Sequence, residues 1–281
     1  MPFCPDLHLH STGSDGVLSP ELLVYEASRT GVNIMAITDH DTFEGRDQLR
    51  ENEQPILVIP GVELSIRDMH GLHLLGYGFA EGRELRGTVH RLAEKRVDRA
   101  KMMLARLEAL GMPLEWEAVQ RKCRGTVGRP HIARAMVHAG YVASMQEAFE
   151  RYLAHGKPGY VANEQLSMAD ALALMRRSGF VPVLAHPCEL NQTDQALIAL
   201  LECWKEQGLM GVEVYHPSSR SHGMEQLDRM TRRMGLLVTG GSDFHQENDR
   251  HGHIGCMSRD WRLADQDTEA LLSAIRSSTE V

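Results

Sequence analysis

Two histidines near the N-terminus stand two residues apart, within residues 6–11. In an extended strand alternate side chains share a face, so Asp6, His8 and His10 would point one way and the leucines between them the other. Imidazoles about 7 Å apart on one strand face can bind one metal ion, or two neighbouring ions. An isolated His-x-His pair also occurs by chance, so a metal site requires further ligands from elsewhere in the chain.

Further potential ligands stand where short apolar runs begin or end. Residues 33–38 lead directly into Asp39-His40-Asp41, and residues 180–185 lead into His186. Taken singly, such residues can be explained as turn formers, helix caps or surface charges. Nine of them at the ends of predicted strands, or in adjoining loops, together favour one shared metal site. In chain order the predicted ligands are His8, His10, Asp15, His40, Glu63, His73, His186, Asp243 and His245.

The types of ligand narrow the choice of metal. Imidazoles and carboxylates without cysteine favour Mn²⁺, Zn²⁺ or iron over soft metals, and the set exceeds what one ion needs. We predict a centre of two or three ions, with Mn²⁺ as the first choice and Zn²⁺ or iron as alternatives. The five cysteines form no C-x-x-C pair, so neither a disulfide framework nor a structural zinc knuckle is indicated.

Seven short apolar runs would position these ligands, and most of the runs are separated by helix-like segments. Near-continuous apolar strands that alternate with helices indicate a parallel sheet covered on both faces. Both a (β/α) barrel and an open doubly wound sheet carry their sites at strand C-termini. Ligands from at least five strands converge more easily in a closed barrel, so residues 1–84 and 161–281 are predicted to form one. The runs are residues 3–10, 33–38, 56–59, 73–77, 180–185, 211–215 and 236–239.

Residues 85–160 interrupt the alternation of apolar strands and helices. Their apolar residues follow helical spacing in four segments, and a glycine, the usual αL cap, follows each segment. The stretch holds 14 Lys and Arg against 7 Asp and Glu, although the formal net charge of the whole chain is −8. We predict a small, basic, all-helical insertion that holds an anionic substrate beside the metal ions. The segments are residues 88–110, 113–124, 129–139 and 144–155, followed by Gly111, Gly125, Gly140 and Gly156.

Composition places the chain among ordinary globular proteins, with 42% hydrophobic and 24% charged residues. No run approaches the roughly 18 apolar residues of a membrane span. The N-terminus lacks the basic and apolar regions of a signal peptide, so we expect a cytoplasmic location and no membrane partner. The negative net charge argues against stable binding of duplex nucleic acid. The sequence leaves the oligomeric state open.

Five segments resemble the signature blocks of the polymerase and histidinol phosphatase (PHP) family. The resemblance spans the predicted barrel from end to end. It implies an α/β fold, a distorted (β/α)₇ barrel, together with phosphoester hydrolysis and metal-binding roles for the nine residues given above. Asp15 is also assigned to the catalytic residues. The five segments are Asp6-Leu7-His8-x-His10-Ser11, Thr38-Asp39-His40-Asp41, Gly61-x-Glu63, Ala185-His186-Pro187 and Ser242-Asp243-x-His245.

Residues 128–135 and 155–161 of the insertion resemble a branch of that family whose members act on nucleoside 3′,5′-bisphosphates or short oligonucleotides. The resemblance implies a nucleotide phosphatase that removes the 3′-phosphate and leaves the 5′-monophosphate. Two alternatives remain within the fold: a 5′→3′ exonuclease on short 5′-phosphorylated oligonucleotides, and a phosphomonoesterase of the histidinol phosphate type. A metal-dependent binding module without activity is a third alternative, which the complete ligand set disfavours.

Phosphate ester hydrolysis needs a nucleophile at neutral pH and neutralisation of the phosphoryl oxygens, and a pair of metal ions supplies both. The leaving 3′-oxygen needs a proton, for which His131 and His216 are the candidates. His131 also lies at a predicted helix start, where a phosphate contact is equally expected. Asp6 is expected to orient an imidazole from behind. The residues predicted to hold the 5′-phosphate are Arg129, Arg134, Lys157 and His131.

Overall fold

Seven strands form one nearly closed barrel in the computed structural model. The structure describes residues 2–50, 54–120, 127–219, 221–247, 252–255 and 262–279. The strands follow one another around the barrel in chain order, so each strand pairs with its neighbours in sequence. This arrangement confirms the predicted distorted (β/α)₇ barrel. The strands are β1 (Pro5–Leu9), β2 (Ile34–Ile37), β3 (Leu57–Ser65), β4 (His73–Tyr77), β5 (Val181–Leu184), β6 (Gly211–Tyr215) and β7 (Leu237–Gly240).

The segment after β7 closes the barrel against β1. The Asp243 N–H donates to the carbonyl of His8 at 2.8 Å, and the His10 N–H donates to the carbonyl of Phe244 at 3.0 Å. Glycine is required at position 241, because a Cβ there would lie 2.5 Å from the backbone nitrogen of His8. The close approach of these two segments places residues 8–10 beside residues 243–245.

Strand β4 runs antiparallel to both of its neighbours, which corrects the expectation of a fully parallel sheet. Ser65 at the end of β3 pairs with His73 at the start of β4, and Tyr77 at the end of β4 pairs with Val181 at the start of β5. The first residue of β4 therefore lies at the barrel edge where the other strands end. This reversal explains why His73 begins its apolar run, whereas His40, His186 and Asp243 come after theirs.

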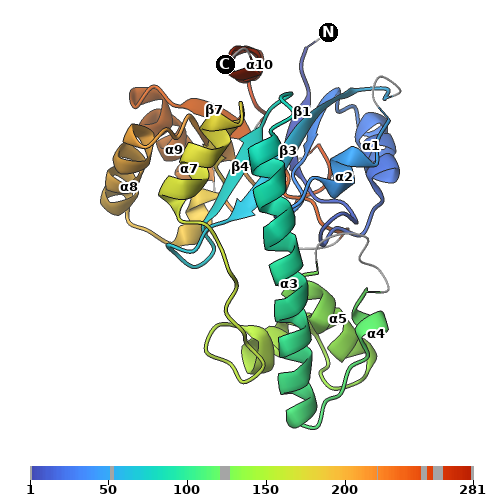
Figure 1. The fold of residues 1–281 in the computed structure, drawn as a ribbon. Helices are drawn as coiled ribbons and strands as arrows, with labels where there is room; N and C mark the ends of the chain where they lie inside the picture. Colours follow the sequence, from blue (N-terminus) through green and yellow to red (C-terminus); the bar gives the residue numbers. More distant parts are fainter. Residues whose placement is uncertain are drawn as a thin grey trace.

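Helices cover the outside of the barrel, as Figure 1 shows. Three of them begin at N-cap residues, where the side chains of Ser19, Ser167 and Thr193 accept backbone N–H groups. No helix of the described ranges is long and apolar enough to cross a membrane. The covering elements are α1 (Pro20–Arg29), α2 (Glu44–Asp47), α7 (Met168–Arg177), the 3₁₀ turn η2 (Pro187–Leu190), α8 (Asp194–Glu206), α9 (Ser221–Arg233) and α10 (Asp265–Thr279).

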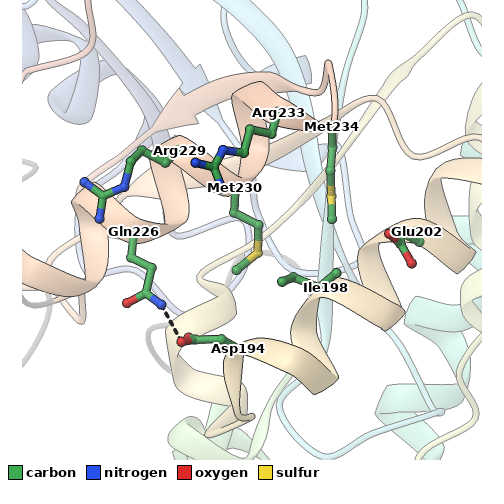
Figure 2. A pocket seen from close by; sticks show the side chains of 8 residues that line it. All are labelled: Asp194, Ile198, Glu202, Gln226, Arg229, Met230, Arg233 and Met234. Atoms are coloured by element: carbon green, nitrogen blue, oxygen red, sulfur yellow. Dashed lines mark hydrogen bonds between the residues drawn. The ribbon is translucent and has the colours of Figure 1, made fainter.

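A groove of about 660 Å³ lies between α8 and α9 on the outside of the barrel (Figure 2). Met230 and Ile198 are among its lining residues, and Gln226 donates a hydrogen bond to Asp194 across it. None of the predicted site residues lines this groove, so we assign it no part in the chemistry.

The helical insertion has its own core. Its elements are α3 (Arg83–Ala109), α4 (Trp116–Gln120), α5 (Arg129–His138) and α6 (Met145–Ala148), which continues into the π-helical turn η1 (Phe149–Leu153). The predicted glycine caps are confirmed at Gly111 and Gly140, whose φ angles are 81° and 76°. Gly156 has a φ of 77° but lies in a turn beyond the helical residues, which end at Leu153. Gly125 and the end of the second predicted helix lie outside the described residues. The fourth predicted helix is wrong in detail, because it is α-helical only as far as Ala148.

The long helix α3 joins the two cores. Near its start Leu85 and Val89 pack in the barrel core, and near its end Met103 and Leu107 pack in the core of the insertion. At 1.5 Å per residue its 27 residues span about 40 Å. Figure 1 shows α3 running from the side of the barrel to the group formed by α4 and α5. The domain limits at 84/85 and 160/161 stay a prediction.

Candidate metal centre

The nine predicted ligands gather at one end of the barrel. His8 and His10 come from β1, and their Nε2 atoms lie 3.2 Å apart. Each of these atoms also lies within 3.4 Å of Glu63 Oε2 and within 3.3 Å of Asp243 Oδ1. This first group therefore combines side chains from β1, from β3 and from the segment after β7.

Glu63 links the first group to a second. Its Oε2 lies 2.9 Å from His40 Nδ1, and its Oε1 lies 2.8 Å from His73 Nδ1 and 3.0 Å from His186 Nε2. The carboxylate is buried, so its two oxygens are available only to these neighbours. Glu63 occupies the centre of the cluster.

Asp15 and His245 complete the set at the side of the cluster nearest the loop after β1. Asp15 Oδ1 lies 3.3 Å from His245 Nε2, and the rings of His10 and His245 stack with centroids 4.1 Å apart. The structure thus brings together all nine residues that the sequence singled out.

The donor set fits divalent metal ions. Two neighbouring ligands that each lie about 2.1 Å from one ion are about 3.0–3.4 Å from each other, and the contacts above fall largely in that range. His40 Nδ1, Glu63 Oε2 and Asp15 Oδ1 are buried but form no hydrogen bond with the described residues. Buried polar atoms normally have a partner, so atoms that converge without hydrogen bonding are well suited to bind a cation.

Electrostatics in the cluster favour ionised carboxylates and protonated imidazoles, except at His73, where burial lowers the pKa. Burial by itself would raise the pKa of Glu63, but the charges of His40, His73 and His8 hold it well below its usual range. Burial opposes protonation of His186, yet the hydrogen bond and charge of Glu63 raise its pKa to about 9. Metal ions binding here would have to displace protons from imidazoles, because only the deprotonated nitrogen is a ligand.

Two aspartates brace His40 on either side. Asp39 accepts hydrogen bonds from the Ser11 N–H at 2.8 Å and from the Ser14 hydroxyl at 2.6 Å, which fixes the loop after β1. Asp41 accepts from the Ser65 N–H at 2.9 Å and forms an ion pair with Arg96 of α3. The apolar run before them could not have revealed these roles.

Asp6 does not orient an imidazole, contrary to expectation. Its carboxylate accepts hydrogen bonds from the N–H and hydroxyl of Ser242 at 2.9 and 2.7 Å and from the Gly255 N–H at 2.8 Å. Its contact with His8 is to the backbone N–H, at 3.5 Å. Asp6 therefore fixes the segment after β7, because β1 and that segment lie side by side.

Glu213 of β6, a residue that was not predicted, contacts the ring nitrogen of an imidazole that faces away from the cluster. Its Oε1 lies 3.0 Å from His8 Nδ1, and its Oε2 accepts the backbone N–H of His186 at 2.8 Å. The sequence did carry a signal, since Glu213 is a single carboxylate in the middle of an apolar run and is fully buried.

His216, which follows β6, reaches the edge of the cluster. Its Nε2 lies 3.5 Å from Asp243 Oδ2, and its Nδ1 accepts the N–H of Ser218 at 3.1 Å. His131 of α5 is also buried, and its Nδ1 accepts the Gly128 N–H at 3.1 Å. Because Nδ1 of His131 accepts, the proton of its neutral ring lies on Nε2. Nδ1 of His216 also lies 2.7 Å from the Ser218 hydroxyl, to which a protonated Nδ1 would donate.

The insertion contacts the loop that carries Asp15 through a basic side chain. The Arg134 guanidinium donates to the backbone carbonyl of Asp15 at 2.9 Å, so it is committed to that loop. Arg129 lies over the rings of Phe149 and Tyr160, at 5.6 and 6.0 Å from their centroids. Lys157 is exposed. Of the four residues predicted to bind phosphate, Lys157 is thus the one that the structure leaves on the surface.

Arg99 of α3 is a basic residue that was not predicted. It is buried, donates to the carbonyl of Val161 at 2.7 Å and lies over the ring of Tyr160. Burial and the charges of Arg129 and Arg96 lower its pKa to about 10. Within the described parts of the chain, no carboxylate forms an ion pair with Arg99 or Arg129. Two neighbouring guanidinium groups without acidic partners form a basic surface that suits an anion.

Comparisons with known proteins agree with this site. A family model for the PHP domain matches residues 6–164. The 5′-3′ exoribonuclease Rnm of Escherichia coli (strain K12) is 35% identical over 248 residues, which cover 86% of this chain and 85% of that protein. The 3′,5′-nucleoside bisphosphate phosphatase of Chromobacterium violaceum is 31% identical over 259 residues, 89% of this chain and 90% of that protein.

A solved structure from Bifidobacterium adolescentis, of a protein assigned to the metal-dependent phosphoesterases, has a TM-score of 0.83 to this chain at 28% identity. The match covers 96% of both chains. This chain is therefore similar, over most of its length, to proteins that cleave more than one kind of phosphate ester.

Proposed function

Because the chain belongs to the PHP family of phosphoesterases, we propose that it is a metal-dependent phosphatase acting on nucleoside 3′,5′-bisphosphates, such as adenosine 3′,5′-bisphosphate. In this reaction water adds to the 3′-phosphorus, the bond from phosphorus to the 3′-oxygen breaks, and that oxygen takes a proton. The products are inorganic phosphate and the nucleoside 5′-monophosphate. The observation that carries the proposal is the nine-residue cluster together with buried Arg99 and partly exposed Arg129, neither of which forms an ion pair with a carboxylate of the described residues.

The cluster supplies the chemical centre. We propose that the nine residues His8 to His245 described above hold two or three ions, with Mn²⁺ preferred and Zn²⁺ or iron as alternatives. When bound, such ions neutralise phosphoryl oxygens and lower the pKa of water, which provides a nucleophile at neutral pH. Glu63, Asp15 and Asp243 contribute negative charge, and their lowered pKa values keep them ionised at neutral pH.

The insertion supplies recognition of the second phosphate. Arg129 and Arg99 are proposed to bind the 5′-phosphate, because their guanidinium groups are forks that match phosphate oxygens. Arg134 is proposed to assist by fixing the loop that carries Asp15. Lys157 is proposed to contact the phosphate from the surface, since it lies close in sequence to Tyr160, over which both arginines stack.

Two imidazoles are candidates for protonating the 3′-oxygen. His216 presents its Nε2 proton beside Asp243, at the metal cluster itself. His131 presents its Nε2 proton nearer the insertion, and burial lowers its pKa, so the ring is neutral at pH 7. A neutral ring that can donate through Nε2 suits a phosphate contact. We therefore propose that His216, in its imidazolium form, gives its Nε2 proton to the 3′-oxygen and becomes a neutral imidazole, and that His131 is a substrate contact.

The exonuclease activity is the second candidate, favoured by the identity of 35% to the exoribonuclease. Both reactions break a bond from phosphorus to a 3′-oxygen in a nucleotide that carries a 5′-phosphate. They differ in whether the 3′-phosphate is terminal or joined to another nucleoside.

Steady-state kinetics of the Mn²⁺-loaded protein separate the candidates. The substrates are adenosine 3′,5′-bisphosphate, adenosine 3′-monophosphate, a 5′-phosphorylated diadenylate and histidinol phosphate. We expect the highest kcat/KM for the bisphosphate, and a clear loss when the 5′-phosphate is absent. A higher kcat/KM for the diadenylate would assign the exonuclease activity instead. Equal values with and without a 5′-phosphate would refute the role of the insertion.

A further inference from the structure

Glu213 occupies an unusual place for a carboxylate. It lies in the middle of β6, where its neighbours Val212 and Val214 belong to the barrel core, and it is fully buried. A buried carboxylate is costly unless it is hydrogen-bonded or paired with a positive charge. Glu213 satisfies this requirement through groups that belong to two predicted metal ligands.

One oxygen of Glu213 contacts the ring of His8. Oε1 lies 3.0 Å from Nδ1, and both side chains are inaccessible to solvent. An ionised carboxylate only accepts hydrogen bonds, so the proton lies on Nδ1 of His8. The opposite nitrogen, Nε2, faces His10, Glu63 and Asp243 in the cluster.

The other oxygen of Glu213 holds the backbone of His186. Oε2 accepts the His186 N–H at 2.8 Å. His186 has a φ of 27°, in the left-handed region that residues other than glycine rarely adopt. A conformation of this kind persists only where surrounding contacts impose it, and the bond to Glu213 is such a contact.

We propose that Glu213 is a positioning residue that orients two metal ligands at once, the ring of His8 and the backbone that carries His186. Carboxylates that hold the outer nitrogen of a ligating imidazole fix its tautomer and strengthen it as a ligand. The proposal rests on the metal centre assigned under the proposed function.

Glu213 could also be considered a ligand, because it forms a group with His8 and His216 whose donor atoms lie within 4.8 Å of one another. Both of its oxygens are already engaged, Oε1 by the His8 ring and Oε2 by the His186 N–H. A positioning role uses the carboxylate as it stands, whereas ligation would require it to release one of these contacts.

Calorimetric titration of metal-free protein with Mn²⁺ tests the inference. Glu213→Gln keeps the size of the side chain but makes it neutral and removes one acceptor, so we expect Mn²⁺ affinity to fall by about 10- to 100-fold. Glu189→Gln is the matched control, since that carboxylate lies 3.9 Å from His186 Nδ1 but is partly exposed. The control should change affinity by less than about 2-fold, as expected for an exposed pair.

The outcomes distinguish two kinds of failure. If the wild type binds no Mn²⁺, the metal centre itself is refuted, and the inference with it. If the wild type binds Mn²⁺ and Glu213→Gln binds it equally well, only the role of Glu213 is refuted.

A second measurement needs no substitution at Glu213 and so does not depend on that variant folding. In the Zn²⁺-loaded wild type, ¹⁵N NMR of the histidine rings should show a protonated Nδ1 on His8, assigned by its loss in His8→Gln. A His8 ring whose Nδ1 carries no proton would overturn the proposal.

Discussion

Metal binding should depend steeply on pH, because the imidazoles of the cluster hold protons that the metal must displace. The hydrogen bond and charge of Glu63 raise the pKa of His186 to about 9 despite its burial. At pH 7 the ring is therefore almost fully protonated in the metal-free protein. Removing that proton at pH 7 costs about 3 kcal/mol, because two pH units separate pH 7 from the pKa. The cost disappears as the pH approaches 9.

His186 alone should accordingly make the affinity for Mn²⁺ rise about tenfold for each pH unit between 7 and 8.5, and its contribution should level off above pH 9. The carboxylates add nothing to this slope, because the lowered pKa values of Glu63, Asp15 and Asp243 keep them ionised throughout. Burial opposes protonation of His8, but the charges of Glu213, Asp243 and Glu63 raise its pKa. Deprotonation of His8 therefore makes the Mn²⁺ affinity depend still more steeply on pH.

Calorimetry provides the assay. Titrations of metal-free protein at pH 7.0, 8.0 and 9.0 give the affinities, and repeating each in two buffers of different ionisation enthalpy counts the protons released. We expect at least one proton per protein at pH 7 and fewer at pH 9. An affinity that is constant between pH 7 and 9, with no proton release, would refute the electrostatic reasoning.

Three further predictions follow from the same cluster and its surroundings. Asp243→Ala and His40→Gln should each lower kcat/KM by at least about 100-fold. Loss of a residue that only holds a metal ligand in place already lowers activity by about 10- to 100-fold, and loss of a ligand should cost more. Near-normal turnover in Mn²⁺-containing buffer would contradict the site. Arg129→Ala and Arg99→Ala should each raise KM for adenosine 3′,5′-bisphosphate by about 10- to 100-fold, which is the effect of losing one hydrogen bond to a charged group. KM for adenosine 3′-monophosphate should change little. Equal effects on both substrates would argue against a 5′-phosphate site. Dialysis against chelator should abolish activity, and Mn²⁺ at about 100 times its Kd should restore it. The same Mn²⁺ concentration should raise Tm by about 5 °C. An unchanged melting curve would indicate that the ions do not bind the folded state.

The sequence predicted the cluster well because its ligands stand at strand ends. Apolar runs followed by His, Asp or Glu identify the edge of a sheet, and convergence at one edge follows from the barrel. The direction of β4 could not be predicted in this way, because an apolar run of five residues reads the same in both directions. The position of His73 at the start of that run was the one local sign of the reversal.

The residues that were missed lie away from strand ends. Glu213 stands inside a strand, where a search for ligands after apolar runs passes over it. Arg99 lies on a helix, and periodicity alone treats a charged helical residue as solvent-exposed. Its burial is caused by tertiary contacts with Val161 and Tyr160, about 60 residues further along the chain. Asp6 was misassigned for the same reason, because its partners Ser242 and Gly255 are distant in sequence.

Helix α3 has a consequence for folding. Its first turns complete the barrel core and its last turns complete the core of the insertion, without a break between them. Unfolding the insertion would remove the packing of Met103 and Leu107 and would fray the same helix that carries Arg96 to Asp41. The two cores are therefore expected to melt as one cooperative unit, with a single transition in calorimetry. A ligand bound by the insertion would then protect the amides of the barrel from hydrogen exchange as well as those of the insertion.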